Sequence, residues 1–167
     1  MWGLGLETAN YPVPVAAPPP AAVQQRVEQP RVFIAGVTGG VGARTLTRLL
    51  APHCPAATRY LTQPRQPTDV LVTNITAAAA AWLPIALEHL STMPVLAVVH
   101  TVPGPVPPAT RARLRAAEQT VHQTVHLPHI PGWTAIETPP AEVLPRRAAR
   151  ARDRLLTAVA ALPHGRT

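Results

Sequence analysis

The segment that most constrains the fold runs from Arg31 to Leu50 and holds four of the nine glycines in the chain. Its residues 32–35 are a β-branched and aromatic run, which is typical of a buried strand. Four glycines follow at positions 36, 39, 40 and 42, and leucines then recur at helical spacing up to Leu50. A glycine turn between a strand and a helix lets backbone N–H groups face an anion at the positive end of the helix. The pattern therefore predicts a strand, an anion-facing turn and a helix.

The rest of the chain alternates apolar runs with helical patterns. Strands are expected over 56–62, 69–74, 94–100 and 121–127, and helices over 76–90, 108–119 and 146–162. Thr76 is the expected N-cap of its helix, and Pro84 should kink that helix or delay its start. The unbroken apolar run at 94–100 favours a central parallel strand. This alternation predicts one three-layer α/β domain over 31–162 with a mainly parallel sheet.

The two ends of the chain lack these patterns. Residues 1–30 contain six prolines and no periodic apolar pattern, which predicts a disordered proline-rich tail, and 163–167 are expected to form a short C-terminal tail. The start has no signal-peptide pattern, and no apolar run reaches the roughly 18 residues of a membrane span. The single cysteine, Cys54, has no partner for an internal disulfide, and we expect it to be partly buried and unreactive. These features favour the cytoplasm.

The glycine turn is similar to two kinds of nucleotide-binding loop. Read as a P-loop, residues 39–45 (Gly-Gly-Val-Gly-Ala-Arg-Thr) resemble the core of the ParA/MinD partition ATPases. In that register Ala43 takes the place of the phosphate-binding lysine, and Arg44 that of the magnesium-binding Ser or Thr. All 15 basic residues of the chain are arginine, so no other register restores the lysine. The resemblance therefore implies a degenerate P-loop without ATP hydrolysis, and we expect no catalytic residues.

Read instead as a dinucleotide-binding turn, residues 36–42 resemble the Gly-x-x-Gly-x-x-Gly of short-chain dehydrogenases. An acidic residue about 20 positions later should then bind the ribose hydroxyls. The first acidic residue after the turn is Asp69, which lies further along the chain than that. A small NAD(P)-binding Rossmann protein is thus one alternative. A ligand-free interaction module, in which the glycines only pack a helix on a strand, is another.

The resemblance to the ParA/MinD proteins extends over about residues 31–162. It is closest to a group of degenerate actinobacterial P-loop proteins associated with conjugative plasmids and other mobile elements. It implies a P-loop NTPase-like (Rossmann-like) fold, at most weak nucleotide binding, and an accessory or scaffold role in mobile-element maintenance or transfer. The implied phosphate-binding residues are Gly36, Gly39, Gly40, Val41, Gly42, Ala43, Arg44 and Thr45. The implied base-contacting residues are His100, Leu127, Pro128 and Trp133.

The histidines raise the question of a metal site. His122 and His126 would share one face of the last strand, with His100 on a neighbouring strand. This spacing is compatible with zinc. No cysteine lies close to these histidines in sequence, however, and we assign no metal.

Basic residues gather on the last predicted helix. The chain has a net charge of +7, and Arg147, Arg150 and Arg154 share one side of this helix. The opposite side carries an apolar stripe formed by Ala148, Ala151, Leu155, Val159 and Leu162. We therefore expect the stripe to pack on the sheet and the arginines to face solvent. Exposed arginines in this arrangement favour an anionic partner: the DNA backbone, an acidic protein or a membrane surface.

Overall fold

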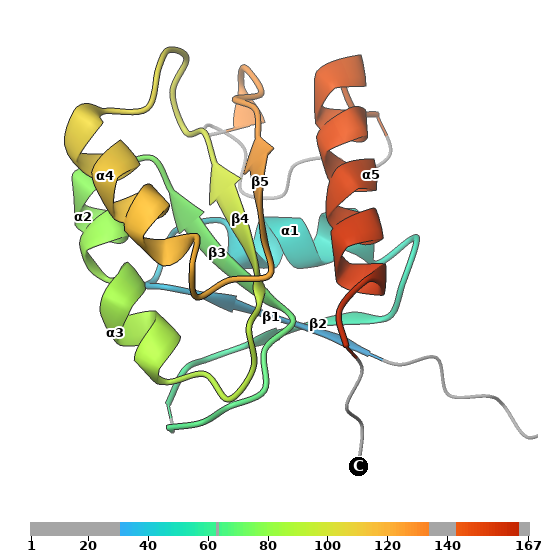
Figure 1. Ribbon diagram of the computed structural model, residues 1–167. Coiled ribbons are helices and arrows are strands. Elements are labelled where there is room, and N and C mark those ends of the chain that lie inside the picture. Colours follow the sequence, from blue (N-terminus) through green and yellow to red (C-terminus); the bar gives the residue numbers. More distant parts are fainter. Residues whose placement is uncertain (1–30, 63, 134–142, 164–167) are drawn as a thin grey trace, which may run out of the picture.

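The computed structural model describes residues 31–62, 64–133 and 143–163 (Figure 1). The expected tail at 1–30 lies outside these residues, and so does the C-terminal tail after Pro163. Within the described residues, the strands are β1 (Val32–Gly36), β2 (Ala56–Arg59), β3 (Val70–Asn74), β4 (Val95–Val99) and β5 (Gln123–Leu127). The helices of the same residues are α1 (Ala43–Leu50), α2 (Ala77–Ala81), α3 (Leu83–Glu88), α4 (Pro108–Ala117) and α5 (Arg146–Ala160).

The strands form one sheet in the order β2-β1-β3-β4-β5, and every pairing is parallel. Ile34 of β1 lies opposite Val70 of β3, and Val70 lies opposite Val95 of β4. The prediction of a mainly parallel sheet is confirmed, and β1, β3 and β4 lie next to one another in it. Order 2-1-3-4-5 is a common doubly wound arrangement, in which the switch point for ligand binding lies between β1 and β3.

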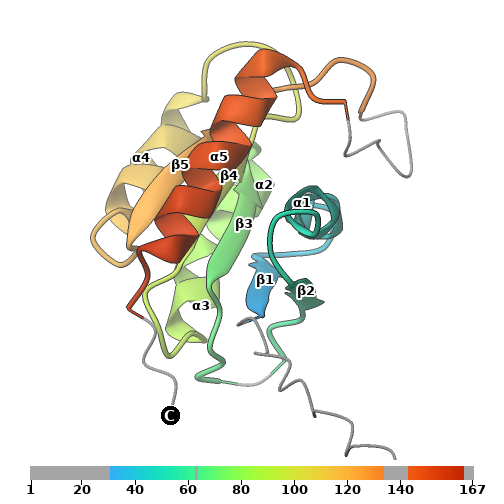
Figure 2. The same cartoon turned by 90° about the vertical axis from the view of Figure 1, so that its right-hand side faces the viewer.

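Helices cover both faces of the sheet, which confirms the three-layer α/β architecture. Helix α1 packs on β1 and β2, and α5 packs on β4 and β5 beside α1. Helices α2, α3 and α4 pack together on the opposite face (Figures 1 and 2). Between β2 and β3, the described residues 60–62 and 64–69 form no helix. A hydrogen bond from Gln66 N to His89 O (2.9 Å) ties this connection to the end of α3.

The core is built from the apolar runs of the central strands. Strand β3 is buried along its whole length, and β4 is buried from Val95 to Val98. Strands covered on both faces need such continuous apolar sequence, which explains why 94–100 reads as a central strand. Strand β5 alternates between buried and exposed residues, as expected at an edge.

Some boundaries differ from the prediction. The single helix expected over 76–90 is two short helices that break at Trp82, because Pro84 in the first turn of α3 cannot donate a backbone hydrogen bond to α2. Thr76 caps α2 as predicted, its Oγ1 accepting a bond from Ala79 N (3.2 Å). Strand β2 ends at Arg59, three residues earlier than expected, and β5 begins two residues later, at Gln123.

Helix α5 has the predicted orientation. Its apolar stripe is buried, and Leu162 remains buried just beyond the end of the helix. Arg147, Arg150 and Arg154 are exposed. Among the described residues, no helix combines the length and apolar composition needed to cross a membrane.

Candidate functional site

The glycine turn lies at the carboxyl edge of the sheet, at the switch point between β1 and β3. Val37 N donates a hydrogen bond to Val72 O (2.9 Å), which anchors the start of the turn to β3. Gly40 and Gly42 have φ angles of +76° and +98°, and glycine adopts this left-handed conformation without steric cost. Val41 between them is buried, so the turn folds back onto the core.

Helix α1 begins directly at this turn, with Gly42 as its N-cap. No side chain caps the helix, and its first turn contains no acidic residue. The first amide groups of a helix have no partner within the helix, and they carry the positive end of its dipole. The start of α1 is therefore suited to bind an anion.

A groove lies beside the turn and is enclosed on its other side by the end of β2. This glycine-turn groove, of about 660 Å³, is lined by residues 36–45 and 58–62. All eight residues that the P-loop resemblance implies are among them. Arg44 reaches across from α1, and its Nη2 donates a hydrogen bond to the hydroxyl of Tyr60 (3.2 Å).

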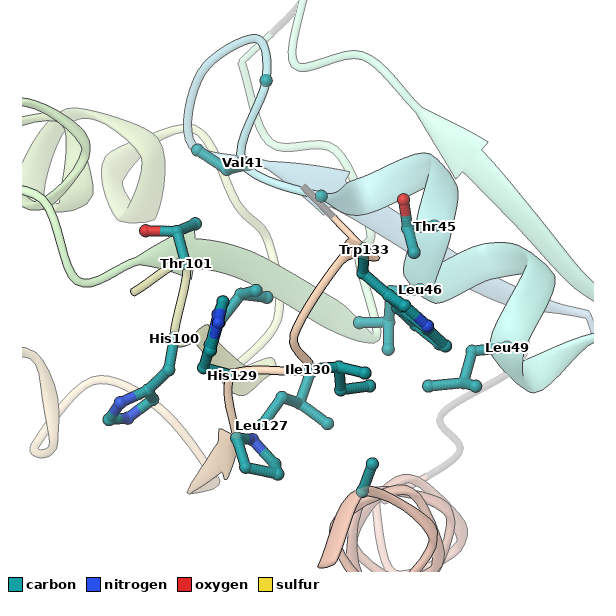
Figure 3. A pocket seen from close by; sticks show the side chains of 15 residues that line it. Val41, Thr45, Leu46, Leu49, His100, Thr101, Leu127, His129, Ile130 and Trp133 are labelled. Carbon is teal, nitrogen blue, oxygen red and sulfur yellow. The ribbon is translucent and has the colours of Figure 1, made fainter. Parts of the chain in front are cut away.

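A second cavity, the apolar pocket, lies on the other side of the turn between α1, α5 and the ends of β4 and β5 (Figure 3). It has a volume of about 200 Å³. Its apolar walls include Leu46, Leu49, Leu127, Ile130 and Trp133. The four residues expected to contact a base all line this pocket, namely His100, Leu127, Pro128 and Trp133.

The two cavities meet at the glycine turn. Gly40, Val41, Gly42 and Thr45 line both of them. The predicted phosphate loop and the predicted base loop lie far apart in sequence, and the parallel order of the strands brings them to one edge. One ligand could therefore occupy both cavities, with a flat apolar ring in the apolar pocket and an anionic group in the glycine-turn groove.

The segment after β5 shapes the apolar pocket. Trp133 N donates to Ile130 O (3.2 Å), and Gly132 between them has a φ of +81°. This tight turn places Trp133 in the wall of the pocket, which also includes Leu46 of α1 (Figure 3). His100 N donates to Leu127 O (2.9 Å), which joins the ends of β4 and β5.

The ring of His100 points away from the pocket (Figure 3) and toward His126. Its Nε2 lies 3.1 Å from Nδ1 of His126, and the rings meet edge to face. Burial lowers the pKa of both imidazoles, and the neighbouring His126 lowers that of His100 further. Glu118 acts on the pKa of His126 in the opposite direction. In the described part of the chain, no three His, Cys, Asp or Glu residues group closely enough to bind a metal ion.

Cys54 lies just past α1 and is partly buried, as expected. Its Sγ lies 3.8 Å from Leu50 O. Burial raises the pKa of the thiol, so the thiolate needed for nucleophilic chemistry is disfavoured.

The arginines of α5 form a separate surface. Arg150 and Arg154 line a shallow groove with Gln123 of β5, whereas Arg147 lies outside it. Asp153 in the same groove pairs with Arg152 (2.9 Å). The three predicted arginines are thus exposed on one helix without lining one cavity.

The second wall of the glycine-turn groove, which includes Thr58 and Tyr60, was not predicted from the sequence. These residues are remote from the glycines in sequence and carry no motif. They reach the groove because β2 pairs directly with β1, with Ala35 opposite Arg59. A prediction of strand order would have identified them, because parallel neighbours bring their carboxyl ends together.

Fold and site together define the class of this chain: a doubly wound, all-parallel α/β domain with a glycine turn at its switch point. Comparison with protein-family models, with curated proteins and with solved structures finds no match to the chain.

Proposed function

We propose that this protein binds a nucleotide across the glycine turn without hydrolysing it. The base would occupy the apolar pocket, and the phosphates would lie in the glycine-turn groove against the start of α1. The fold is then a degenerate P-loop-like variant of the α/β architecture. The observation that carries the proposal is the turn at Gly40–Gly42, whose residues line both cavities.

The sizes of the cavities support a two-part ligand. Pockets that enclose a whole drug-sized ligand usually measure about 300–1,000 Å³. The apolar pocket, at about 200 Å³, suits a single ring system. The glycine-turn groove is larger and more polar, so it can hold the sugar and phosphates.

Hydrolysis is not part of the proposal, because the chain has no lysine and Ala43 stands in the lysine position. Phosphoryl transfer depends mostly on positioning and on neutralising the developing charge. Without the lysine, the turn would retain binding through its backbone and lose the main contact to the transferred phosphate.

A flavin mononucleotide or a nicotinamide dinucleotide is the alternative ligand. The strand order favours FMN of these two, since flavodoxin-like folds share the order 2-1-3-4-5 and flavodoxin binds FMN at the β1/β3 switch point. The same two cavities would then hold a larger ring and its phosphate.

The exposed arginines of α5 would bind an anionic partner, either the DNA backbone or an acidic protein. Together with the nucleotide site, they would suit an accessory or scaffold factor. The resemblance to ParA/MinD-type proteins suggests that this factor serves the maintenance or transfer of mobile elements.

A thermal-shift panel tests the nucleotide proposal. It compares ATP, ADP, GTP, NAD, NADP and FMN, each with and without Mg²⁺, because a ligand that binds only the folded state raises the melting temperature. Ile130→Asn, in the apolar pocket, should abolish the shift, while the control Ile85→Asn, on the exposed side of α3, should retain it. If no nucleotide shifts the wild type, the proposal is wrong and a ligand-free interaction module becomes the better account.

A further inference from the structure

We propose that Arg44, positioned by Tyr60, supplies the fixed positive charge for the phosphate end of the ligand, and that this anion binds without a divalent metal. The inference rests on the proposed nucleotide function and assigns a role within the same site. Tyr60 belongs to no recognisable sequence motif. It reaches the site only because β2 lies next to β1 in the sheet.

The first observation is the position of the two side chains. Arg44 is the second residue of α1, and Tyr60 directly follows β2, so they lie on opposite walls of the glycine-turn groove. The 3.2 Å hydrogen bond between them holds the guanidinium beside the turn. A hydrogen bond between the hydroxyls of Thr47 and Thr58 (2.8 Å) ties the same two elements together deeper in the fold.

The second observation is the unfavourable position of Arg44 within its own helix. A cation in the first turn opposes the positive end of the helix dipole, and this turn has no acidic residue to compensate. An anion in the groove would resolve the conflict, because it would attract the dipole and the guanidinium together.

The chemistry of the guanidinium fits a phosphate. It has five N–H donors in a planar fork, and Tyr60 accepts from one of them. The fork can bind two phosphate oxygens at once, and it stays charged at any physiological pH. A fixed charge of this kind neutralises a phosphate directly, so the affinity should not depend on Mg²⁺.

Two other arginines near the site are distinguishable from Arg44. Arg48 lies one turn further along α1, is exposed and does not line the groove, which makes it a matched control. Arg59 lines the groove, but its guanidinium stacks on the ring of Phe33 (3.7 Å) and donates to Pro67 O (3.1 Å). Arg59 is therefore already engaged elsewhere.

Calorimetric titration with ADP, adenosine and inorganic pyrophosphate, in EDTA and in Mg²⁺, tests the inference. We expect ADP to bind equally well in both buffers. Arg44→Gln should weaken ADP binding about tenfold or more, because a charge-assisted contact is lost, and leave adenosine binding unchanged. Tyr60→Phe should weaken ADP binding by a smaller factor, and Arg48→Gln should leave it unchanged. The side chains of Arg44, Arg48 and Tyr60 are all exposed, so none of the three substitutions disturbs the core. Circular dichroism checks that each variant folds.

The outcomes separate the two proposals. If the wild type binds ADP but Arg44→Gln binds it equally well, or if binding requires Mg²⁺, the role of Arg44 is wrong and the nucleotide function stands. If adenosine and ADP fail to bind but pyrophosphate binds through Arg44, the nucleotide function is wrong and the anion site stands. If none of the three ligands binds, both are wrong.

Discussion

Val41 occupies the space beside Gly36 that a side chain at position 36 would need. A Cβ on Gly36 would lie 2.7 Å from Val41 Cγ2 and 2.9 Å from Thr38 O. Both distances are shorter than the contacts that Cβ atoms make in folded proteins. Gly36→Ala should therefore destabilise the domain by about 1–3 kcal/mol, as overpacking of a tight core does. Urea unfolding followed by circular dichroism measures the change.

Gly39→Ala is the matched control. No heavy atom lies within 4 Å of a Cβ built at Gly39, so the variant should be as stable as the wild type to within about 0.5 kcal/mol. Equal stability of the two variants would contradict the geometry of the turn.

The histidine pair makes stability depend on pH. Because burial lowers the pKa of His100 and His126 in the fold, the unfolded chain binds protons more readily than the folded chain. Their contribution should thus be fully present above their ordinary pKa of about 6.5, and it should be lost progressively as pH falls below that value toward the lowered pKa of the folded state.

His126→Gln should reduce this decline in urea unfolding across the same pH range. His122→Gln, which removes an exposed histidine next to the same strand, should leave it unchanged. An equal pH dependence in wild type and His126→Gln would contradict the assignment.

ATP hydrolysis should not exceed background. Ala43 provides no charge for the transferred phosphate, and positioning by the glycine turn alone does not replace that contact. A coupled phosphate-release assay with purified protein measures the rate. Multiple turnover that disappears in Arg44→Gln would show that hydrolysis belongs to this site and would overturn the prediction.

The arginines of α5 should bind duplex DNA through its phosphates, if DNA is the anionic partner. A helix packed on its own sheet cannot easily enter a groove, so binding should be independent of sequence. The logarithm of the observed binding constant should fall linearly with the logarithm of the salt concentration, with a slope of about −0.9 per phosphate contacted. Replacing Arg147, Arg150 and Arg154 with alanine should weaken binding to two unrelated duplexes alike, as measured by fluorescence anisotropy.

The control replaces three exposed arginines on other elements, Arg48, Arg111 and Arg115, and so changes net charge by the same amount. If this control weakens binding equally, overall charge and not the α5 surface is responsible. If the wild type does not bind DNA even at low salt, an acidic protein becomes the better candidate partner.

Cys54 should react slowly with iodoacetamide at neutral pH, because burial raises the pKa of its thiol. The rate should rise with pH and should become that of an ordinary cysteine when the chain is unfolded in urea. Mass spectrometry of the alkylated protein measures it. A fast reaction in the folded state would contradict the buried, structural assignment.

Much of the fold is predictable because its signals are local. The β-branched runs of β1, β3 and β4, the cap at Thr76 and the break near Pro84 each depend on a few neighbouring residues. The apolar stripe of α5 follows from helical periodicity in the same way. Boundaries such as the end of β2 depend on where the chain must leave the sheet, which no local pattern specifies.

The candidate site was only partly predictable. The glycines identify the anion-facing turn by themselves, whereas the partner of Arg44 depends on β2 lying next to β1. The contact between His100 and His126 likewise depends on the register of β4 and β5, in which Val99 lies opposite Leu127. Such contacts depend on the tertiary arrangement of the strands, so the spacing of residues along the sequence does not predict them.

The all-parallel sheet determines how slowly this domain can assemble. No two of its strands can pair as a hairpin, and even the most local pairing, of Val32 with Ala56, must first close a loop that contains the whole of α1. The entropy of closing such loops has to be overcome before strand contacts compensate for it, which makes parallel sheets intrinsically slow to fold. We therefore expect refolding on the millisecond timescale or slower, with the apolar strands β3 and β4 transiently exposed to aggregation.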